Sequence, residues 1–247
     1  MKKIVIASLL VASSLLYSDM IRLEMGGGVW SQGSSGSIKH KNDRYSIDLT
    51  DDLDVGISQD FYLWAYFKHP VPIIPNVRME YTNTLLDGTG SNFTYNGKNY
   101  SSPTSYELGI EQVDMIAYYN ILDNLAWITL DVGLDLNFMS QSYQFSNDSA
   151  VSDSIIVPML YTRGRFQIPA TGFAFESEIK YLNFGSSTVG DIRVKVDYTF
   201  DLAVVQPGVE LGYRHEIIKT SRDDFSDLRN DTDITMSGVY LGAMIRF

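Results

Sequence analysis

Apolar and polar residues alternate along most of this chain with a period of two. The clearest run lies within 125–145, where apolar residues occupy every second position from Ile128 to Phe138, and Asp131 and Asp135 stand between them. Successive side chains of a strand point to opposite faces. This run therefore predicts a strand with one apolar face and one face that needs water or polar partners.

Nine more segments show the same alternation, and each is bounded by glycine, proline or clustered polar residues. These candidate strands are 20–30, 60–69, 77–85, 105–119, 155–167, 173–184, 191–200, 205–218 and 234–247. In the last of them, Leu241, Ala243 and Ile245 share one face, whereas Met244 and Arg246 share the other. An apolar face opposite a face with charges suits a strand between lipid and a polar lumen.

The connections between these strands alternate in length. The long ones are 31–59, 87–104, 146–153, 185–190 and 219–233, and the short ones are 70–76, 120–124, 168–172 and 201–204. Long loops on one side and short turns on the other are typical of outer-membrane barrels. We therefore expect an all-β, transmembrane, antiparallel up-and-down barrel of about ten strands, with eight or twelve as alternatives.

The first residues predict export. Met1–Lys3 is basic, Ile4–Leu16 is an apolar run, and Ser18 is a small residue suited to the position before a cleavage site. This pattern is typical of a secretory signal peptide. We predict a signal peptide at 1–18, a barrel at 19–247 and a location in the outer membrane. A soluble periplasmic β-sandwich is the alternative, but it would place its apolar faces inside.

Composition excludes several classes of function. The chain has no cysteine, which rules out disulfides, a thiol nucleophile and zinc–thiolate sites. Its net charge of −11 argues against nucleic acid as a partner, because binding nucleic acid needs a basic surface. The three histidines are scattered and show no metal-ligand spacing. We expect no metal, no cofactor and no catalytic residue.

Charged residues on the polar faces of the strands predict the nature of the lumen. Basic and acidic residues are equal in number on these faces: Arg22, Lys68, Arg78, Arg163, Arg165, Lys180, Arg193, Lys195, Arg214 and Arg246 against Glu24, Asp60, Glu80, Asp114, Asp131, Asp135, Glu176, Glu178, Asp197 and Glu210. Barrels of about eight strands are just wide enough for side chains to fill. Opposite charges should pair there, so we expect a closed or very narrow lumen. The alternative is a selective path for small solutes.

One histidine raises the question of chemistry at the rim. His215 lies beside Glu216 near an acidic loop, a setting that a rim-site hydrolase or acyltransferase would use. Alternation puts Arg214 inward, so His215 is expected to point outward. The acidic stretches 48–54 and 222–227 lack EF-hand spacing and are interpreted as solvated loops rather than calcium sites.

Several short stretches resemble a small family of Gram-negative outer-membrane β-barrels with no established function. They are Arg22-Leu23-Glu24 with Gly26–Trp30, Lys68–Pro72 with Pro75–Arg78, Tyr118–Asn120 with Leu122–Asn124, and Val196–Asp201. The resemblance covers residues 19–247 and implies a fold and a compartment, without any catalytic residue. The terminal Phe247 resembles the signal that the barrel-assembly machinery recognises, so that machinery and outer-membrane lipid are the expected partners.

These observations lead to one main hypothesis. We expect a non-enzymatic integral outer-membrane barrel whose role is structural or is carried by its exposed loops, with an unidentified extracellular ligand if there is one. A small-solute channel and a rim-site hydrolase or acyltransferase are the alternatives.

Overall fold

The computed structural model describes residues 21–71, 73–125, 127–202 and 205–247. The predicted signal peptide, 1–18, lies outside the described residues. Ten long β-strands form one barrel: β1 (Arg22–His40), β3 (Ile57–Lys68), β4 (Asn76–Gly90), β7 (Thr104–Leu125), β8 (Ile128–Phe145), β9 (Val151–Gln167), β10 (Phe173–Phe184), β11 (Ser187–Thr199), β12 (Gln206–Thr220) and β13 (Asn230–Arg246). Among the described residues, no helix is long and apolar enough to cross a membrane.

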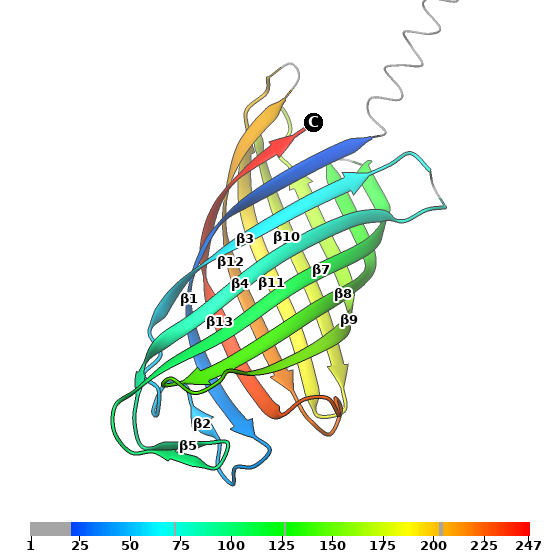
Figure 1. The fold of residues 1–247 in the computed structure, drawn as a ribbon. Coiled ribbons are helices and arrows are strands. Elements are labelled where there is room, and N and C mark those ends of the chain that lie inside the picture. Colours follow the sequence, from blue (N-terminus) through cyan, green and yellow to red (C-terminus); the bar gives the residue numbers. More distant parts are fainter. Residues whose placement is uncertain (1–20, 72, 126, 203–204) are drawn as a thin grey trace, which may run out of the picture.

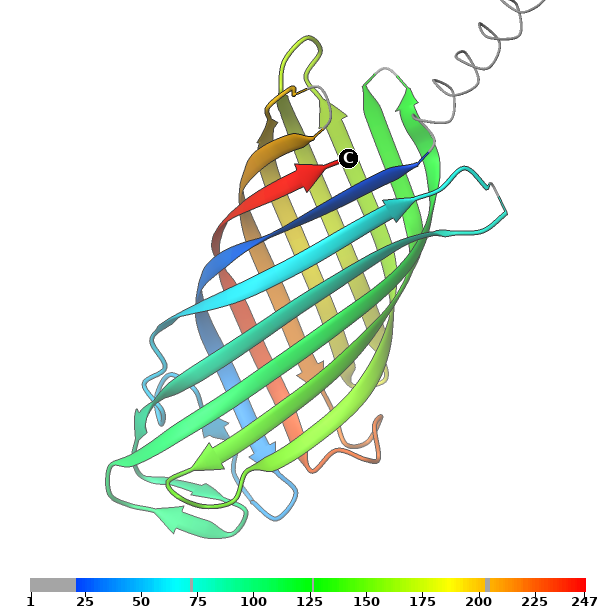
Figure 2. The ribbon, with the colours of Figure 1, turned by 45° about the horizontal axis from the view of Figure 1, so that its top comes forward.

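The barrel is closed and has an up-and-down topology. Each barrel strand pairs antiparallel with the next one along the chain, and β13 pairs with β1 from Glu24↔Arg246 to His40↔Asn230. Figures 1 and 2 show the last strand beside the first, with the C terminus near the start of β1. The predicted fold class and the predicted number of strands are confirmed. A closed ladder joins the two strands that would otherwise be sheet edges.

The two ends of the barrel differ. The loop end carries the connections 41–56, 91–103, 146–150, 185–186 and 221–229. The turn end carries the described start of β1, the C terminus and the other four connections (Figure 1). Three short strands belong to the loop end: β2 (Ile47–Asp48) pairs with β1, and β5 (Phe93–Tyr95) pairs with β6 (Lys98–Tyr100).

Several strands are longer than predicted at the loop end. β1 continues to His40 rather than ending at Trp30, and β3 begins at Ile57. In the same way β12 ends at Thr220 and β13 begins at Asn230. Backbone pairing holds these extensions together although most of their outward side chains are polar, so the apolar–polar alternation of a lipid-facing strand does not predict them.

Two predicted connections are wrong. The predicted turn at 120–124 lies inside β7, which continues to Leu125. The predicted long loop at 185–190 is a two-residue turn, Gly185–Ser186, between paired Phe184 and Ser187. Gly185 has a φ of +59°, a conformation that glycine adopts without steric cost and that two-residue hairpins use.

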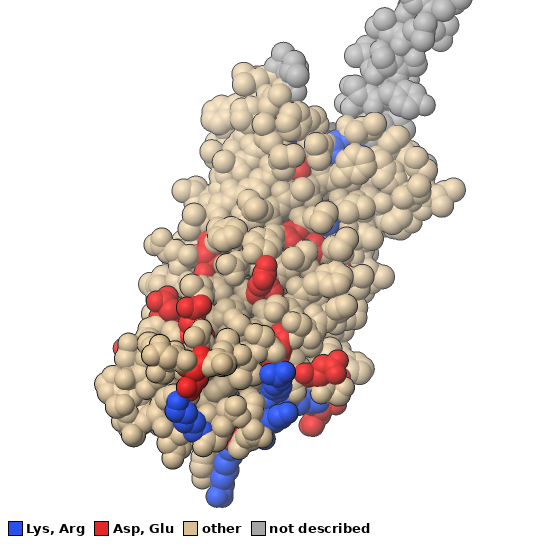
Figure 3. Space-filling view, in the orientation of Figure 1, with Lys and Arg blue, Asp and Glu red and all other residues tan. Residues whose placement is uncertain are grey.

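The outer wall is apolar around the middle of the barrel. Leu134, Leu160, Leu211 and Leu241 are exposed by 61%, 66%, 58% and 63%, and they point away from the interior. Figure 3 shows charged residues gathered toward the loop end, whereas the wall near the turn end is almost free of them on this face. A soluble barrel would bury its leucines, so this exposure suits lipid contact.

The interior of the loop end is apolar and is covered by folded loops. Leu49 and Leu53, from the stretch interpreted as a solvated loop, are fully buried, so that interpretation is wrong for its apolar residues. The ring of Phe93 on β5 lies 5.0 Å from that of Tyr100 and 5.1 Å from that of Phe145. Buried aromatic area outweighs the cost of ordering these loops.

Candidate functional site in the barrel lumen

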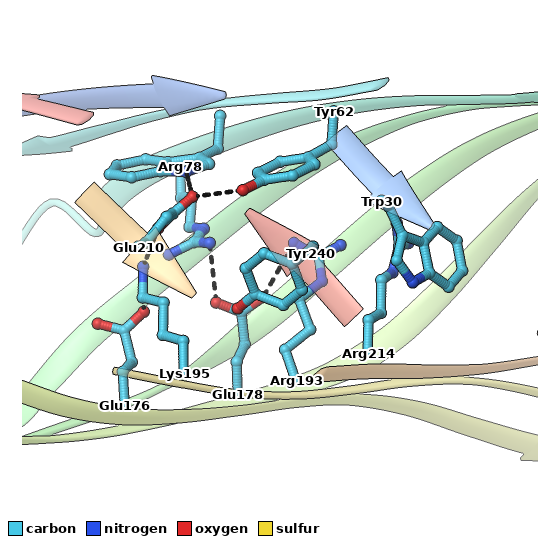
Figure 4. A pocket seen from close by; sticks show the side chains of 11 residues that line it. Trp30, Tyr62, Arg78, Glu176, Glu178, Arg193, Lys195, Glu210, Arg214 and Tyr240 are labelled. Atoms are coloured by element: carbon cyan, nitrogen blue, oxygen red, sulfur yellow. Dashed lines mark hydrogen bonds and ion pairs between the residues drawn. The ribbon is translucent and has the colours of Figure 1, made fainter. Parts of the chain in front are cut away.

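The middle of the lumen is built from two unlike walls. Strands β9 to β12 direct arginine, lysine, aspartate and glutamate inward, whereas β3 directs Tyr62, Trp64 and Tyr66 inward, with one further aromatic residue each from β1 (Trp30) and β13 (Tyr240). Figure 4 shows these side chains meeting across the bore. The alternation of each strand fixes which side chains point inward, and closure of the barrel brings the two walls face to face.

Lys180 is the centre of the ion-pair network. Its ammonium lies 2.9 Å from Oε2 of Glu80, 3.0 Å from Oδ2 of Asp114 and 3.3 Å from Oδ2 of Asp191. The Lys180 side chain is only 1% exposed. Three carboxylates around one buried ammonium make a cross-link between β10, β4, β7 and β11. Each buried charge here has partners in place of water, and loss of one partner would leave an uncompensated charge.

Three arginines extend this cluster. Arg193 lies 2.7 Å from Glu80 and 2.6 Å from Asp191, and Arg214 lies 3.1 Å from Asp191. Arg78 lies 2.5 Å from Glu80 on its own strand. It also lies 3.0 Å from Glu178 on β10. The guanidinium groups thus tie opposite walls of the barrel together.

A second cluster lies nearer the turn end. Arg163 binds Asp131 at 2.6 Å and Glu176 at 2.7 Å. Arg165 binds Glu176 at 3.1 Å and Asp197 at 2.5 Å. These pairs join β8, β9, β10 and β11. Each guanidinium bridges two carboxylates, which is the geometry that a planar donor fork favours.

Glu210 links the charged wall to the aromatic wall. It receives hydrogen bonds from the hydroxyl of Tyr62 at 2.8 Å and from Nε1 of Trp64 at 3.1 Å, and it lies 2.8 Å from Nζ of Lys195 (Figure 4). Lys195 also lies 3.2 Å from Glu176. The carboxylate is therefore satisfied by donors on β3 and β11 at once.

Cations also stack on the aromatic wall. The guanidinium of Arg214 lies 4.5 Å from the ring of Trp30, and the ammonium of Lys195 lies 5.0 Å from that of Trp64. Arg163 lies 5.0 Å from the ring of Tyr66. These distances are within the range of cation–π attraction, so the aromatic residues also stabilise the charged wall.

The space left between the two walls is very small. The cavity drawn in Figure 4 has a volume of about 20 Å³. That volume holds about one water molecule. Its lining consists of Trp30, Tyr62, Trp64, Arg78, Glu176, Glu178, Arg193, Lys195, Glu210, Arg214 and Tyr240. The described lumen is therefore filled by its own side chains at this level.

Most of the predicted lumen residues lie in this network. The structure places these members within ion-pairing distance of one another: Arg78, Glu80, Asp114, Asp131, Arg163, Arg165, Glu176, Glu178, Lys180, Arg193, Lys195, Asp197, Glu210 and Arg214. Arg22, Glu24 and Arg246 pair at the turn end. Lys68 binds Asp123 near the same end, and Asp60 accepts hydrogen bonds from Gln32 and the backbone of Leu85.

Asp135 is the exception to the expected pairing. It is fully buried, and neither carboxylate oxygen has a hydrogen-bond partner among the described residues. Asp114 is its diagonal neighbour, because Asp114 lies opposite Asn137, two residues further along β8. A buried carboxyl beside another carboxylate is costly to keep ionised.

The sequence prediction missed two members of the network. Asp191 binds Lys180, Arg193 and Arg214, and Glu216 lies 3.3 Å from Arg214. Each stands two residues from an arginine that the alternation assigns to the lumen. Continuing the alternation by one step on β11 and β12 would have found them.

His215 and Glu216 lie on opposite faces of β12. His215 is half-buried on the outer side, where Nδ1 lies 2.7 Å from Oγ of Ser237, whereas Glu216 points inward and accepts a hydrogen bond from Gln112 at 2.6 Å. The two side chains therefore do not form a joint acid–base site. Within the part of the chain that the structure describes, no group of three or more His, Cys, Asp or Glu residues could hold a metal ion.

No protein-family model matches this sequence, and no curated protein matches it. Solved outer-membrane proteins are similar to it in structure. The outer membrane protease OmpT of Escherichia coli has 9% identity and a TM-score of 0.49, with 92% of this chain and 96% of that chain covered. Ail, the attachment invasion locus protein of Yersinia pestis, in complex with the heparin analogue sucrose octasulfate, has 11% identity and a TM-score of 0.39, with 92% and 99% covered. AlkL, solved in DMPC lipid bilayers, has 12% identity and a TM-score of 0.36, with 91% and 90% covered.

Proposed function

We propose that this protein is an integral outer-membrane β-barrel with a closed lumen, and that its biological role is carried by its loop end. The observation that carries the proposal is the ion-pair network around Lys180, which crosses the bore and leaves a cavity of about 20 Å³. A hydrated ion or a metabolite is larger than one water molecule, so passage would require the network to come apart.

The membrane location follows from the outer wall. Exposed leucines on neighbouring strands, such as Leu134 on β8 and Leu160 on β9, make an apolar surface without charged side chains between them. Closure of the ladder between β1 and β13 satisfies the backbone groups that lipid cannot satisfy. The loop end faces the cell exterior in this proposal, because long connections of such barrels lie outside.

The loop end has a built structure that suits a surface role. The β5–β6 hairpin is held by Lys98, whose ammonium lies 2.7 Å from Asp148 in the β8–β9 connection, and by Tyr100, whose hydroxyl donates to the same carboxylate at 2.6 Å. Such loops present a defined shape to an extracellular partner. The proposal assigns no catalytic residue, because His215 and Glu216 do not face one another.

Single-channel recording tests the closed lumen. Residues 19–247 would be refolded, and folding would be checked by heat-modifiable migration in gels. We expect no conductance steps from folded, inserted protein in a planar bilayer. Reproducible steps would overturn the proposal and favour the small-solute channel.

A deletion variant separates a barrier inside the lumen from a barrier in the loops. Deletion of 92–101, which removes the β5–β6 hairpin, should leave insertion unchanged and conductance silent, because the network around Lys180 is the barrier. Conductance that appears only on this deletion would place the barrier in the loops instead.

A further inference from the structure

A polar vestibule opens at the turn end of the barrel. Its volume is about 800 Å³, far larger than the cavity inside the network. Seven barrel strands or their connections contribute to it. The lining residues used below are Arg22, Trp127, Gln167, Thr199, Gln206 and Arg246. This space lies in the proposed periplasmic mouth and has no part in the closed lumen.

The lining of the vestibule carries three basic residues, Arg22, Arg165 and Arg246, against one acidic residue, Asp201. Arg246 lies 2.9 Å from Oε1 of Glu24, and Arg22 approaches the same oxygen through Nε at 3.5 Å. One buried carboxylate is thus shared by two guanidinium groups. The Arg22 side chain is 41% exposed, so N–H groups of its guanidinium remain available to bind a further anion. This basic mouth belongs to a chain whose net charge is −11.

Uncharged hydrogen-bonding groups line the same space. Oγ1 of Thr199 is buried behind this surface, so the hydrogen-bonding groups that a ligand could reach are the side-chain amides of Gln167 and Gln206. The amide of Gln206 reaches Asp201 only at 3.4 Å, and the amide of Gln167 reaches the carbonyls of Thr171 and Phe173 at 3.3 Å. Such long bonds are weak and easily exchanged for better ones. A ligand with amide groups would satisfy these donors and acceptors.

The rim carries an aromatic residue in a strained conformation. Trp127 has a φ of +66°, in the left-handed region that bulky residues avoid, and its side chain is half exposed. Ala170, across the vestibule, has a φ of +59°. Strained backbone at a cavity often accompanies a ligand site. Trp127 and the nearby Phe173 offer an apolar contact beside the arginines.

We propose that the vestibule binds the carboxylate end of a short peptide. The carboxylate lies against Arg22 and Arg246, the amide groups bond to Gln167 and Gln206, and an apolar side chain contacts Trp127. A planar carboxylate suits the two guanidinium forks, which already share the carboxylate of Glu24. The inference goes beyond the closed barrel proposed above and does not depend on whether the lumen conducts.

Equilibrium binding of a dansyl-labelled tripeptide, dansyl-Ala-Ala-Ala, to the detergent-solubilised protein tests this site. We expect saturable binding of the peptide with a free carboxylate. The same peptide with an amidated C terminus should bind roughly tenfold more weakly or worse, the loss expected for a hydrogen bond to a charged group. Equal binding of both peptides, or no binding of either, would overturn the proposal.

Variants locate the site. Arg22→Gln should weaken binding roughly tenfold, and it leaves the Arg246–Glu24 pair intact, so the barrel should still fold. Arg44→Gln makes the same chemical change at the loop end and should leave binding unchanged. If both variants weaken peptide binding equally, the peptide is held by general electrostatic attraction rather than at the vestibule, and the proposal is wrong. Competition by inorganic phosphate as strong as that by the unlabelled tripeptide would reduce the site to a general anion site and contradict the peptide assignment.

Discussion

The ammonium of Lys180 on β10 lies 2.9 Å from Oε2 of Glu80 on β4, and both side chains are only 1% exposed. These residues are far apart in sequence and belong to strands that are not neighbours in the sheet. Their contact therefore crosses the bore. It fills the bore at this level with packed, polar side chains.

Removing Lys180 should be strongly destabilising. Lys180→Met leaves Glu80, Asp114 and Asp191 with one cation fewer in a buried site, and we expect the free energy of unfolding to fall by about 3–5 kcal/mol. Urea unfolding in lipid vesicles, followed by tryptophan fluorescence, measures this. Lys41→Met, an exposed position in the β1–β3 connection, is the matched control and should have almost no effect. Similar losses in both variants would contradict the central role of Lys180.

Asp135 should tolerate neutralisation, unlike Asp191. Asp135→Asn removes a buried carboxyl that has no hydrogen-bond partner among the described residues, so stability should stay unchanged or rise by about 1–3 kcal/mol. Asp191→Asn makes the same change where three cations bind, and it should lower stability. The same unfolding measurement compares the two. If Asp135→Asn destabilises as much as Asp191→Asn, the Asp135 carboxyl makes a stabilising contact, for which its diagonal neighbour Asp114 is the candidate.

The hydrogen bond from Tyr62 to Glu210 depends on a glycine. A Cβ atom at Gly242 would lie 2.3 Å from the Tyr62 hydroxyl and 3.0 Å from Oε1 of Glu210. Gly242→Ala should therefore displace Tyr62 and cost about 1–3 kcal/mol. Tyr62→Phe should remove most of the same hydrogen bond, so the double variant should lose less than the sum of the two single losses.

A control for that experiment is Gly164→Ala. A Cβ atom there would meet nothing within 4 Å, so we expect no loss of stability. If the stability losses of Gly242→Ala and Tyr62→Phe simply add in the double variant, the two positions act independently. That result would contradict the expected clash between a side chain at position 242 and the Tyr62 hydroxyl.

Acid should release the β5–β6 hairpin. The pKa of Asp148 lies below its usual value because Lys98 and then Tyr100 donate hydrogen bonds to its carboxylate. A lowered pKa in the folded state means that the stabilising effect is complete above the ordinary aspartate pKa, about 3.9, and is lost as the pH falls through the lowered value. The protection factors of the amides of residues 93–100, measured by hydrogen exchange, should therefore stay constant down to the ordinary aspartate pKa and fall only in stronger acid.

Asp148→Asn is the control for the acid experiment. It removes the titrating group, so the protection factors in the hairpin should be lower at neutral pH and should no longer change with acid. An unchanged acid response in this variant would assign the transition to another group.

The alternation of side chains determined much of this protein by itself. A period of two has a direct structural cause, because each strand places successive residues on opposite faces. That is why the sequence alone assigns residues such as Arg163, Arg165, Glu176 and Glu178 to the polar faces of their strands. The apolar faces, such as that of Leu134, predicted a barrel that turns its leucines outward.

Only the tertiary structure decided what those faces do together. Alternation is a local property, and it says nothing about which strand stands across the bore. Closure between β1 and β13 brings Lys180 to Glu80, and Glu210 to Tyr62. It also leaves Asp135 without a hydrogen-bond partner among the described residues.

The same distinction explains the loops and the vestibule. The burial of Leu49 is a long-range packing event, and no local pattern reports it. The vestibule joins Arg22 to Arg246, which lie near opposite ends of the sequence. The sequence by itself predicted which faces are polar and that about ten strands form the barrel, whereas eight and twelve strands stayed open. The folded barrel decided which charges meet, because pairing across the lumen depends on register and closure rather than on neighbours along the chain.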